Sequence, residues 1–215
     1  MKKILILSGP THEYIDPVRF IGNASSGLMG KAIAEEAERR GFEVDFVSGP
    51  VAPAHLPDLK PPGSMHPVTS AADMLAVSET LFDAADAVVF AAAVADYTPA
   101  ERKTEKMTKA TDELVLRLRP TPDIAKTLCA SKRPDQAAIG FALQTADGET
   151  HARRKLMTKN LDGIVLNTPA SLGAPTGSFS FLGRDADAFE QWGSIAKAAC
   201  AKHILDVIER LLPRE

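Results

Sequence analysis

The chain has few cysteines and histidines, no long hydrophobic run and no marked excess of either charge. Its 215 residues include 2 cysteines and 5 histidines, and neither type shows the paired spacing of a metal-binding motif. Cys129 and Cys200 lie in alanine-rich, helix-like stretches, which favours buried thiols and suits a reducing cytosol. The apolar run at 4–7 is too short for a signal-peptide core, and no later run could span a bilayer. We therefore expect a cytoplasmic protein without structural disulfides.

The charge balance also excludes some partners. The formal net charge is -3 at pH 7, so neither nucleic acid nor an anionic membrane is expected as the main partner. The Walker lysine motif, the G-x-S-x-G elbow and the G-x-G-x-x-G dinucleotide fingerprint are all missing, so a nucleotide would have to be held in another way. With 45% hydrophobic and 25% charged residues, the chain has an ordinary globular composition, and we predict a single domain over 1–215.

Strand-like and helix-like patterns alternate along most of the chain. Strands are predicted at 4–7, 43–48, 87 onwards, 137–141 and 162–167, and helices within 25–41, 70–81, 121–128, 149–160 and 194–212. Short apolar strands separated by helices are typical of a parallel sheet that is covered on both faces. The sequence therefore predicts a doubly wound α/β fold, with its ligand at the carboxyl ends of the strands, in the loops after Leu7, Ser48 and Phe90.

Local signals predict where several elements begin and end. Gly41 can end a helix in a left-handed conformation, and Ser70 with Asp73 forms a helix-start pair. At 121–123, a threonine hydroxyl would cap a helix, with a proline in its first turn. The proline-rich connector 49–67 is predicted to be irregular, and the alternation at 114–118 predicts a strand with one covered face.

The loop from Gly9 to Gly30 separates the first strand from the first helix. It places Ser25, Ser26 and Gly27 at the helix start, where unpaired N–H groups and the helix dipole attract phosphate or carboxylate. A serine pair here is more often only a cap. Asn23 could donate to a developing oxyanion or could simply stabilise the turn. On the residues alone, both alternatives stay open for the serines and for Asn23.

Two further groups could contact a ligand. Alanines at 91–93 would let a flat ligand approach a strand end, with Asp96 as an acceptor for an amino group or a ribose hydroxyl. The alternative is tight packing with Asp96 as a helix cap. Downstream lysines could neutralise a triphosphate or could form solvated surfaces; they are Lys103, Lys106 and Lys109 in one loop, and Lys155 and Lys159 on one face of a helix.

Taken together, these segments resemble the phosphopantothenate–cysteine ligase family. The resemblance rests on "GPTHEYIDPVRFIGNASSGLMG", "AAAVADY", "KMTK", "TPDI", "GFALQT" and "KLMTKNLD", which occur in this order between Ile4 and Asn167. It implies a Rossmann-like fold and an enzyme of coenzyme A biosynthesis that joins 4'-phosphopantothenate to L-cysteine. The reaction would use CTP as co-substrate, accompanied by Mg²⁺, and would pass through an acyl-cytidylate. It would release pyrophosphate first and then CMP.

The resemblance also implies roles for particular residues. Asn23 would act on the acyl-cytidylate by polarising its carbonyl. Lys106 would lie at the triphosphate and take part in nucleotidyl transfer. The other implied nucleotide-contacting residues are Gly9, Ser25, Ser26, Gly27, Phe90, Ala91, Ala92, Asp96, Pro120, Thr121, Pro122, Asp123, Phe141, Lys155 and Lys159. No metal ligands are assigned.

The resemblance further implies a homodimer, with a dimerisation segment at about 97–119. The resemblance is to the stand-alone form of the ligase, which implies that a separate phosphopantothenoylcysteine decarboxylase would act on the product. The chain departs from the family pattern at Thr108, Gln144 and Asp187, which bear on nucleotide preference and on the last strands. A nucleotide-binding module, a dinucleotide oxidoreductase and a catalytically silent relative stay as alternatives; the missing glycine fingerprint and Tyr-x-x-x-Lys pair count against the oxidoreductase.

Overall fold

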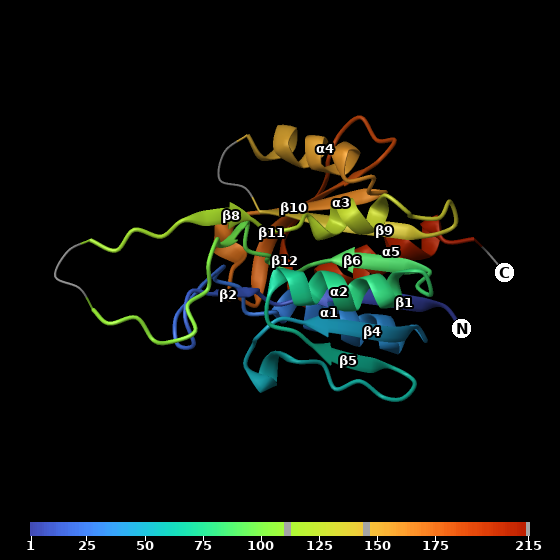
Figure 1. Cartoon of the computed structure of the whole chain (residues 1–215). Helices are drawn as coiled ribbons and strands as arrows, with labels where there is room; N and C mark the ends of the chain where they lie inside the picture. The colour runs from blue at the N-terminus through green and yellow to red at the C-terminus, as the bar shows by residue number, and fades with distance from the viewer. Residues whose placement is uncertain (110–112, 144–146, 214–215) are drawn as a thin grey trace.

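A mainly parallel sheet forms the centre of the computed structural model, which describes residues 1–109, 113–143 and 147–213 (Figure 1). The strand order is β12-β11-β10-β9-β6-β1-β4-β5. The parallel strands are β1 (Lys3–Ser8), β4 (Glu43–Ser48), β5 (Ser64–Pro67), β6 (Ala87–Phe90), β9 (Ala137–Leu143) and β10 (Gly163–Asn167). At one edge, β11 (Thr176–Gly183) and β12 (Glu190–Ala196) are added by antiparallel pairing. The chain builds the sheet outwards in one direction from β1 and then in the other from β6, so the predicted doubly wound α/β fold is confirmed.

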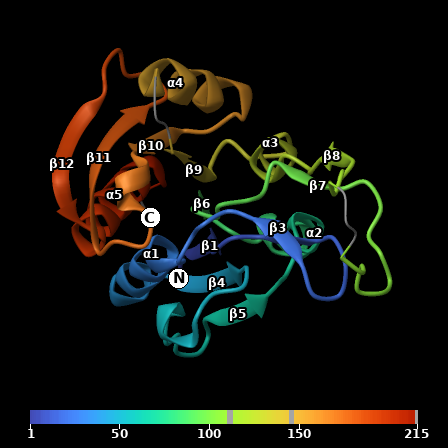
Figure 2. The same ribbon diagram turned by 90° about the vertical axis from the view of Figure 1, so that its left-hand side faces the viewer.

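Helices cover both faces of this sheet (Figure 2). On one face lie α1 (Leu28–Arg39) and α5 (Lys197–Leu211), and on the other lie α2 (Ala71–Phe82), α3 (Ile124–Cys129) and α4 (Gly148–Thr158). Burial on both faces explains the apolar run at 4–7 in β1. Ile4 and Ile6 pack in the core under α1 and α5, whereas Leu5 and Leu7 pack in the core under the other three helices. Because successive side chains of a strand point to opposite faces, a strand buried on both sides needs such a run.

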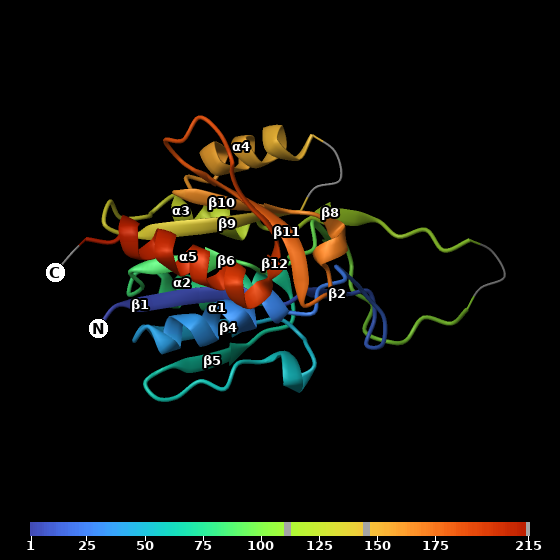
Figure 3. The same ribbon diagram turned by 180° about the vertical axis from the view of Figure 1, so that it is seen from behind.

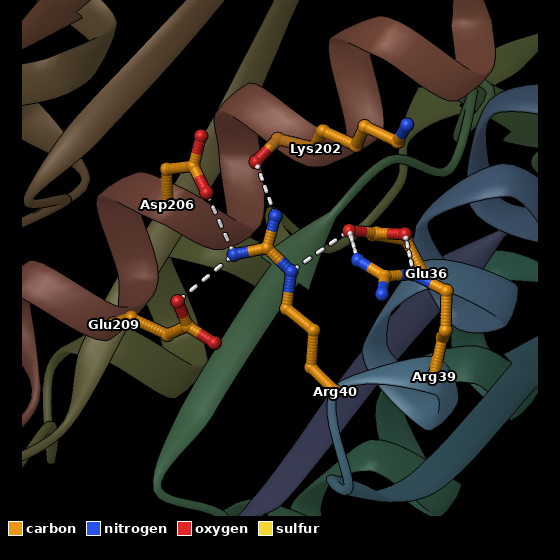
Figure 4. Close-up of polar contacts among 6 residues, drawn as sticks. All are labelled: Glu36, Arg39, Arg40, Lys202, Asp206 and Glu209. Atoms are coloured by element: carbon orange, nitrogen blue, oxygen red, sulfur yellow. Dashed lines mark hydrogen bonds and ion pairs between the residues drawn. The ribbon is translucent and has the colours of Figure 1, made fainter.

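Ion pairs join the carboxyl-terminal end of α1 to α5 (Figure 4). The Arg40 guanidinium donates to the carboxylates of Glu36 at 2.8 Å, Asp206 at 2.7 Å and Glu209 at 2.9 Å. Glu36 also accepts two hydrogen bonds from Arg39, both at 2.7 Å. The hydrogen bonds from Arg39, opposed by burial and reinforced by those from Arg40, lower the pKa of Glu36 to about 2.

Two short antiparallel pairs lie outside the main sheet. Strands β2 (His12–Tyr14) and β3 (Phe20–Gly22) form a hairpin within the opening loop, which the sequence did not predict. Strands β7 (Tyr97–Pro99) and β8 (Leu118–Pro120) form a second pair, named here the ribbon. The described residues between β7 and β8, 100–109 and 113–117, extend away from the sheet, as views from opposite sides show (Figures 1 and 3). This part of the chain, named here the arm, coincides with most of the predicted dimerisation segment.

The predicted elements agree with the structure wherever strong local signals set them. Five of the six predicted strands and all five predicted helices form, Gly41 has φ +84°, and Ser70 with Asp73 forms a reciprocal capping box. The Thr121 cap is wrong, because Asp123 caps α3 by accepting from the Lys126 N–H, and Thr121 instead donates to the Ala95 carbonyl.

Three other expectations are wrong in part. The connector 49–67 is not wholly irregular, because it contains a 3-10 turn (Pro53–His55) and the edge strand β5, which tolerates Pro67 at its end. The last helix begins at Lys197 and not at Ser194, because the preceding residues pair with β11 as part of β12. The strand predicted at 114–118 begins only at Leu118. On the face that was expected to be covered, Leu114 is 62% exposed and Leu118 is 43% exposed, so most of this face is open to solvent within one chain.

Candidate active site

A cavity of about 650 Å³ opens at the carboxyl ends of β1, β6, β9 and β10. The start of α1, the segment after β6, the start of α3, one side of α4 and the first residue of α5 form its wall. It therefore lies beside the point where the sheet reverses its direction of growth, between β1 and β6, which is where doubly wound sheets bind ligands. The loop after Ser48 does not line the cavity, so that part of the expected site is wrong.

Most of the predicted binding residues line this cavity. They are Asn23, Ser25, Ser26, Gly27, Phe90, Ala91, Ala92, Asp96, Thr121, Pro122, Asp123, Phe141, Lys155 and Lys159. Three predicted residues do not. Gly9 lies behind the wall, where its carbonyl accepts from the Ala93 N–H at 2.9 Å. Pro120 lines a separate hollow between the hairpin, α2 and the ribbon, and Lys106 lies exposed on the arm.

The amino-terminal end of α1 presents backbone donors to the cavity. Its N-cap residue is Gly27, which has φ 76°, and neither a side-chain cap nor an acidic first-turn residue is present in the described structure. Ser25 does not cap the helix but accepts from the Gly27 N–H at 3.4 Å, inside the turn. The first N–H groups of a helix have no partner within the helix, so this end is suited to an anion. Serine capping, which was the alternative explanation, is therefore not observed.

Asn23 forms hydrogen bonds that hold the segment after β6 in place. Its side-chain Nδ2 donates to the Val94 carbonyl at 2.9 Å and to the Ala93 carbonyl at 3.3 Å. The same segment is held by Thr11, whose Oγ1 accepts from the Ala95 N–H at 3.0 Å, and by Thr121, whose Oγ1 donates to the Ala95 carbonyl at 2.6 Å. The small side chains after β6 are thus fixed at the cavity wall by three polar residues.

Two lysines line the opposite side of the cavity, Lys155 within α4 and Lys159 at the C-cap of this helix. Lys159 Nζ lies 2.9 Å from Asp123 Oδ1, which fixes the start of α3 against α4. Burial, and after it the neighbouring Lys159 charge, lowers the pKa of Lys155, whereas Asp96 and Asp123 oppose this effect. The Lys155 ammonium has no carboxylate within ion-pair distance in the part of the chain that the structure describes, so an anionic ligand group could serve as its partner.

The arm carrying Lys106 is anchored at the hairpin loop and not at the cavity. The Met107 N–H donates to Asp16 Oδ2 at 3.2 Å, and Arg19 Nη2 donates to the Met107 carbonyl at 2.5 Å. Burial alone would raise the pKa of Asp16, but hydrogen bonds from the N–H groups of Val18, Arg19 and Met107, and from the Arg19 guanidinium, lower it to about 2. The arm residue Ala110 and its two successors lie outside the described residues.

The far end of the cavity contains residues that the sequence analysis missed: Asn167, Ser171, Leu172, Gly173 and Lys197. Asn167 is a polar residue at the end of an apolar strand, which is a signal that could have identified it. Lys197 gave no such signal, because its position at the start of α5 depends on β12, which was not predicted.

The structure offers no all-protein metal site among the described residues, where no group of three or more histidine, cysteine, aspartate or glutamate side chains comes together. The acids that line the cavity are Asp96 and Asp123. Along the same residues, no helix has both the length and the apolar character needed to cross a membrane.

Comparison with known proteins shows the family to which this chain belongs. The family model described as DNA/pantothenate metabolism flavoprotein C-terminal domain matches residues 1–212. The chain belongs to this family. Membership confirms the resemblance that was predicted from the sequence motifs.

Relatives of this DNA/pantothenate metabolism flavoprotein C-terminal domain include two that are 45% identical over 82% of the chain. One is named cysteine/cysteine sulfinic acid decarboxylase, from an unknown prokaryotic organism, and the other is coenzyme A biosynthesis bifunctional protein CoaBC of Bacillus subtilis (strain 168). The matches cover 48% and 43% of those proteins, so the chain spans about half the length of the curated relatives it matches.

A solved structure of similar size shows the same fold. The crystal structure of the C-terminal domain of CoaBC has 39% sequence identity and a TM-score of 0.80, and the match covers 98% of this chain and 95% of that one. The similarity therefore extends over nearly the whole of both chains, including the edge strands β11 and β12.

Proposed function

We propose that this chain is a ligase of coenzyme A biosynthesis that joins 4'-phosphopantothenate to L-cysteine and consumes CTP. The observation that carries the proposal is the convergence of the amino end of α1, Asn23 and the two α4 lysines on one cavity. Family membership and the similarity to CoaBC, whose name refers to coenzyme A biosynthesis, support the same reaction.

In the first step, a carboxylate oxygen of 4'-phosphopantothenate attacks the α-phosphorus of CTP. The bond from that phosphorus to the bridging oxygen breaks, and pyrophosphate leaves with the electron pair, so that an acyl-cytidylate remains. The N–H groups at the start of α1 and the ammonium groups of Lys155 and Lys159 would stabilise the triphosphate and the leaving pyrophosphate. Holding the carboxylate beside the α-phosphate in one cavity makes the attack effectively unimolecular.

In the second step, the amine of cysteine attacks the acyl carbon and loses a proton to solvent, and CMP leaves as the amide forms. Asn23 fixes Ala93 and Val94, which flank the cavity, and we assign it to positioning the acyl-cytidylate for this attack. Loss of Asn23 should therefore affect the second step more than the first.

Mg²⁺ would enter with CTP. This ion usually binds through one or two carboxylates together with substrate phosphates, so a cavity without an all-protein cage is compatible with it. Asp96 is the candidate ligand, because Asp123 is paired with Lys159. The ion would supply neutralisation of charge on the triphosphate.

We also propose that the chain forms a homodimer through the ribbon and the arm. Apolar side chains on them are exposed in the single chain: Tyr97 is 54% exposed, Leu114 is 62% exposed and Val115 is 81% exposed. Such a patch is typical of a protein interface. Pairing there would bring a second arm, with its Lys106, towards the cavity that the first chain forms.

Pyrophosphate release tests the proposal. With CTP, Mg²⁺ and cysteine, the purified chain should release pyrophosphate only when 4'-phosphopantothenate is present, and ATP and UTP should be tried in turn. Asn23→Ala should let the acyl-cytidylate accumulate, and Lys106→Gln should block its formation. CTP binding without pyrophosphate release would favour the nucleotide-binding module, and normal turnover by both variants would refute the residue assignment.

A further inference from the structure

Lys197 is a buried cation at the far end of the cavity. It is the first residue of α5, it is 8% exposed, and it lines the cavity wall. No carboxylate lies within ion-pair distance of its ammonium among the residues that the structure describes, and burial lowers its pKa. A buried charge without a counter-charge is costly, and a cation in the first turn of a helix is opposed by the helix dipole. Stability alone therefore does not explain a lysine at this position.

Its hydrogen bonds show what the ammonium does. Lys197 Nζ donates to the Ser171 carbonyl at 3.0 Å and to the Ala174 carbonyl at 2.5 Å. Between these two carbonyls lie Leu172 and Gly173, which form part of the cavity wall. The ammonium thus holds both ends of this short segment, named here the wall segment (171–174), against the start of α5.

The wall segment is also connected to the end of β10. Ser171 Oγ donates its only proton to the Thr168 carbonyl at 2.7 Å, so it must accept from Asn167 Nδ2, which lies at 2.8 Å. Asn167 lies opposite Leu143 in the strand pairing, two residues beyond the pair of Val165 with Phe141. Side chains two apart along a strand share a face, so Asn167 and the wall segment lie on the Phe141 side of the sheet.

We propose that Lys197 is a positioning residue of the nucleotide site, which holds the wall segment and, through Ser171, the Asn167 side chain against the bound nucleotide. The inference rests on the proposed function for its choice of ligand. Because Lys197 would shape the wall and would not contact the reacting atoms, its loss should weaken nucleotide binding and leave the rate of the bound complex nearly unchanged.

The test compares Lys197→Met with Lys197→Arg and with Lys202→Met, an exposed position on the same helix. For Lys197→Met we expect the KM for CTP to rise at least tenfold, with kcat within about twofold of wild type. Lys197→Arg, which keeps donors for the two carbonyls, should recover part of the affinity, and Lys202→Met should match wild type. An unchanged KM in Lys197→Met, or a fall in kcat at unchanged KM, would overturn the proposal.

Two measurements distinguish a failure of this inference from a failure of the proposed ligase activity and from a variant that does not fold. Calorimetric titration with CTP alone needs no turnover: weaker binding by Lys197→Met supports the inference even if no ligase activity is found, and equal binding overturns it even if the ligase is active. A wild-type chain that binds no CTP would overturn both proposals. If Lys197→Met does not fold, Ser171→Ala takes its place, because it removes the hydroxyl that joins Asn167 to the Thr168 carbonyl and keeps the backbone carbonyl that Lys197 holds; a raised dissociation constant for CTP supports the proposal, and an unchanged one overturns it.

Discussion

Gly30, in the first turn of α1, packs directly against Ser8 at the end of β1. A Cβ placed on Gly30 would lie 2.0 Å from Ser8 Oγ and 2.4 Å from Ser8 Cβ. Both residues are buried, so Gly30→Ala must push the helix start away from the sheet. Overpacking of this kind costs about 1–3 kcal/mol, whereas alanine gains up to about 1 kcal/mol over glycine within a helix. We expect the free energy of unfolding to fall by about 1–2 kcal/mol.

A double-mutant cycle isolates this contact. Ser8→Gly removes both clashing atoms, and the next atom, Phe46 Cε2, lies 3.5 Å from the new Cβ, which is ordinary contact. Gly30→Ala should then be neutral or stabilising in the Ser8→Gly background, whereas Ser8→Ala, which keeps the Cβ, should rescue only part of the loss.

Urea unfolding with linear extrapolation measures the four free energies of the cycle. Gly183→Ala is a control for the change from glycine to alanine, because the nearest atom to its new Cβ, Phe181 Cε1, would lie 3.7 Å away, at ordinary contact distance. Since the start of α1 lines the cavity, Gly30→Ala should also raise the KM for CTP. Equal destabilisation by Gly30→Ala in both backgrounds would refute the reasoning.

Three further predictions follow from buried or paired groups. Lys155→Met should raise the KM for CTP roughly tenfold, as expected for one hydrogen bond to a charged group, and Lys155→Arg should recover part of it in steady-state assays. The pKa of Glu36 is lowered from 4.5 to about 2, so the stability it contributes is complete above about pH 4.5 and is lost as the pH falls towards 2; urea titrations should show a shallower fall for Glu36→Gln. Burial raises the pKa of both Cys129 and Cys200 to about 12, so iodoacetamide at pH 8 should label them only after unfolding, and rapid labelling of the native chain would contradict their burial.

The predictable parts of the fold are those set by local signals. The apolar run of β1 implies burial on both faces, and Ser70 with Asp73 marks a helix start through its own hydrogen bonds. By contrast, β12 pairs with β11 alone among the strands that the structure describes, and its segment contains Glu190 and Gly193, so it carries no apolar run. Its strand conformation depends on a partner that is distant in the chain, which local pattern reasoning does not include.

The residues of the site also divide into those that local motifs predict and those that depend on distant parts of the chain. The loop and strand-end motifs placed Asn23 and Asp96 at one cavity, because the carboxyl ends of parallel strands meet at one edge of the sheet. Lys155, on α4, was assigned to the same site by the family resemblance. Lys197 was missed because its place in the cavity follows from the unpredicted β12. Lys106 was expected at the triphosphate, but one chain alone holds it on the arm, so its predicted role depends on the second copy that we propose.

A crystal structure of the chain with CTP tests the central claim most directly. We predict that the triphosphate lies within hydrogen-bond distance of the N–H groups at the start of α1 and of Lys155 Nζ, with the base on the Phe141 side of the sheet. A nucleotide bound instead in the hollow between the hairpin and α2, with the cavity at the strand ends left empty, would contradict the proposed site and the mechanism built on it.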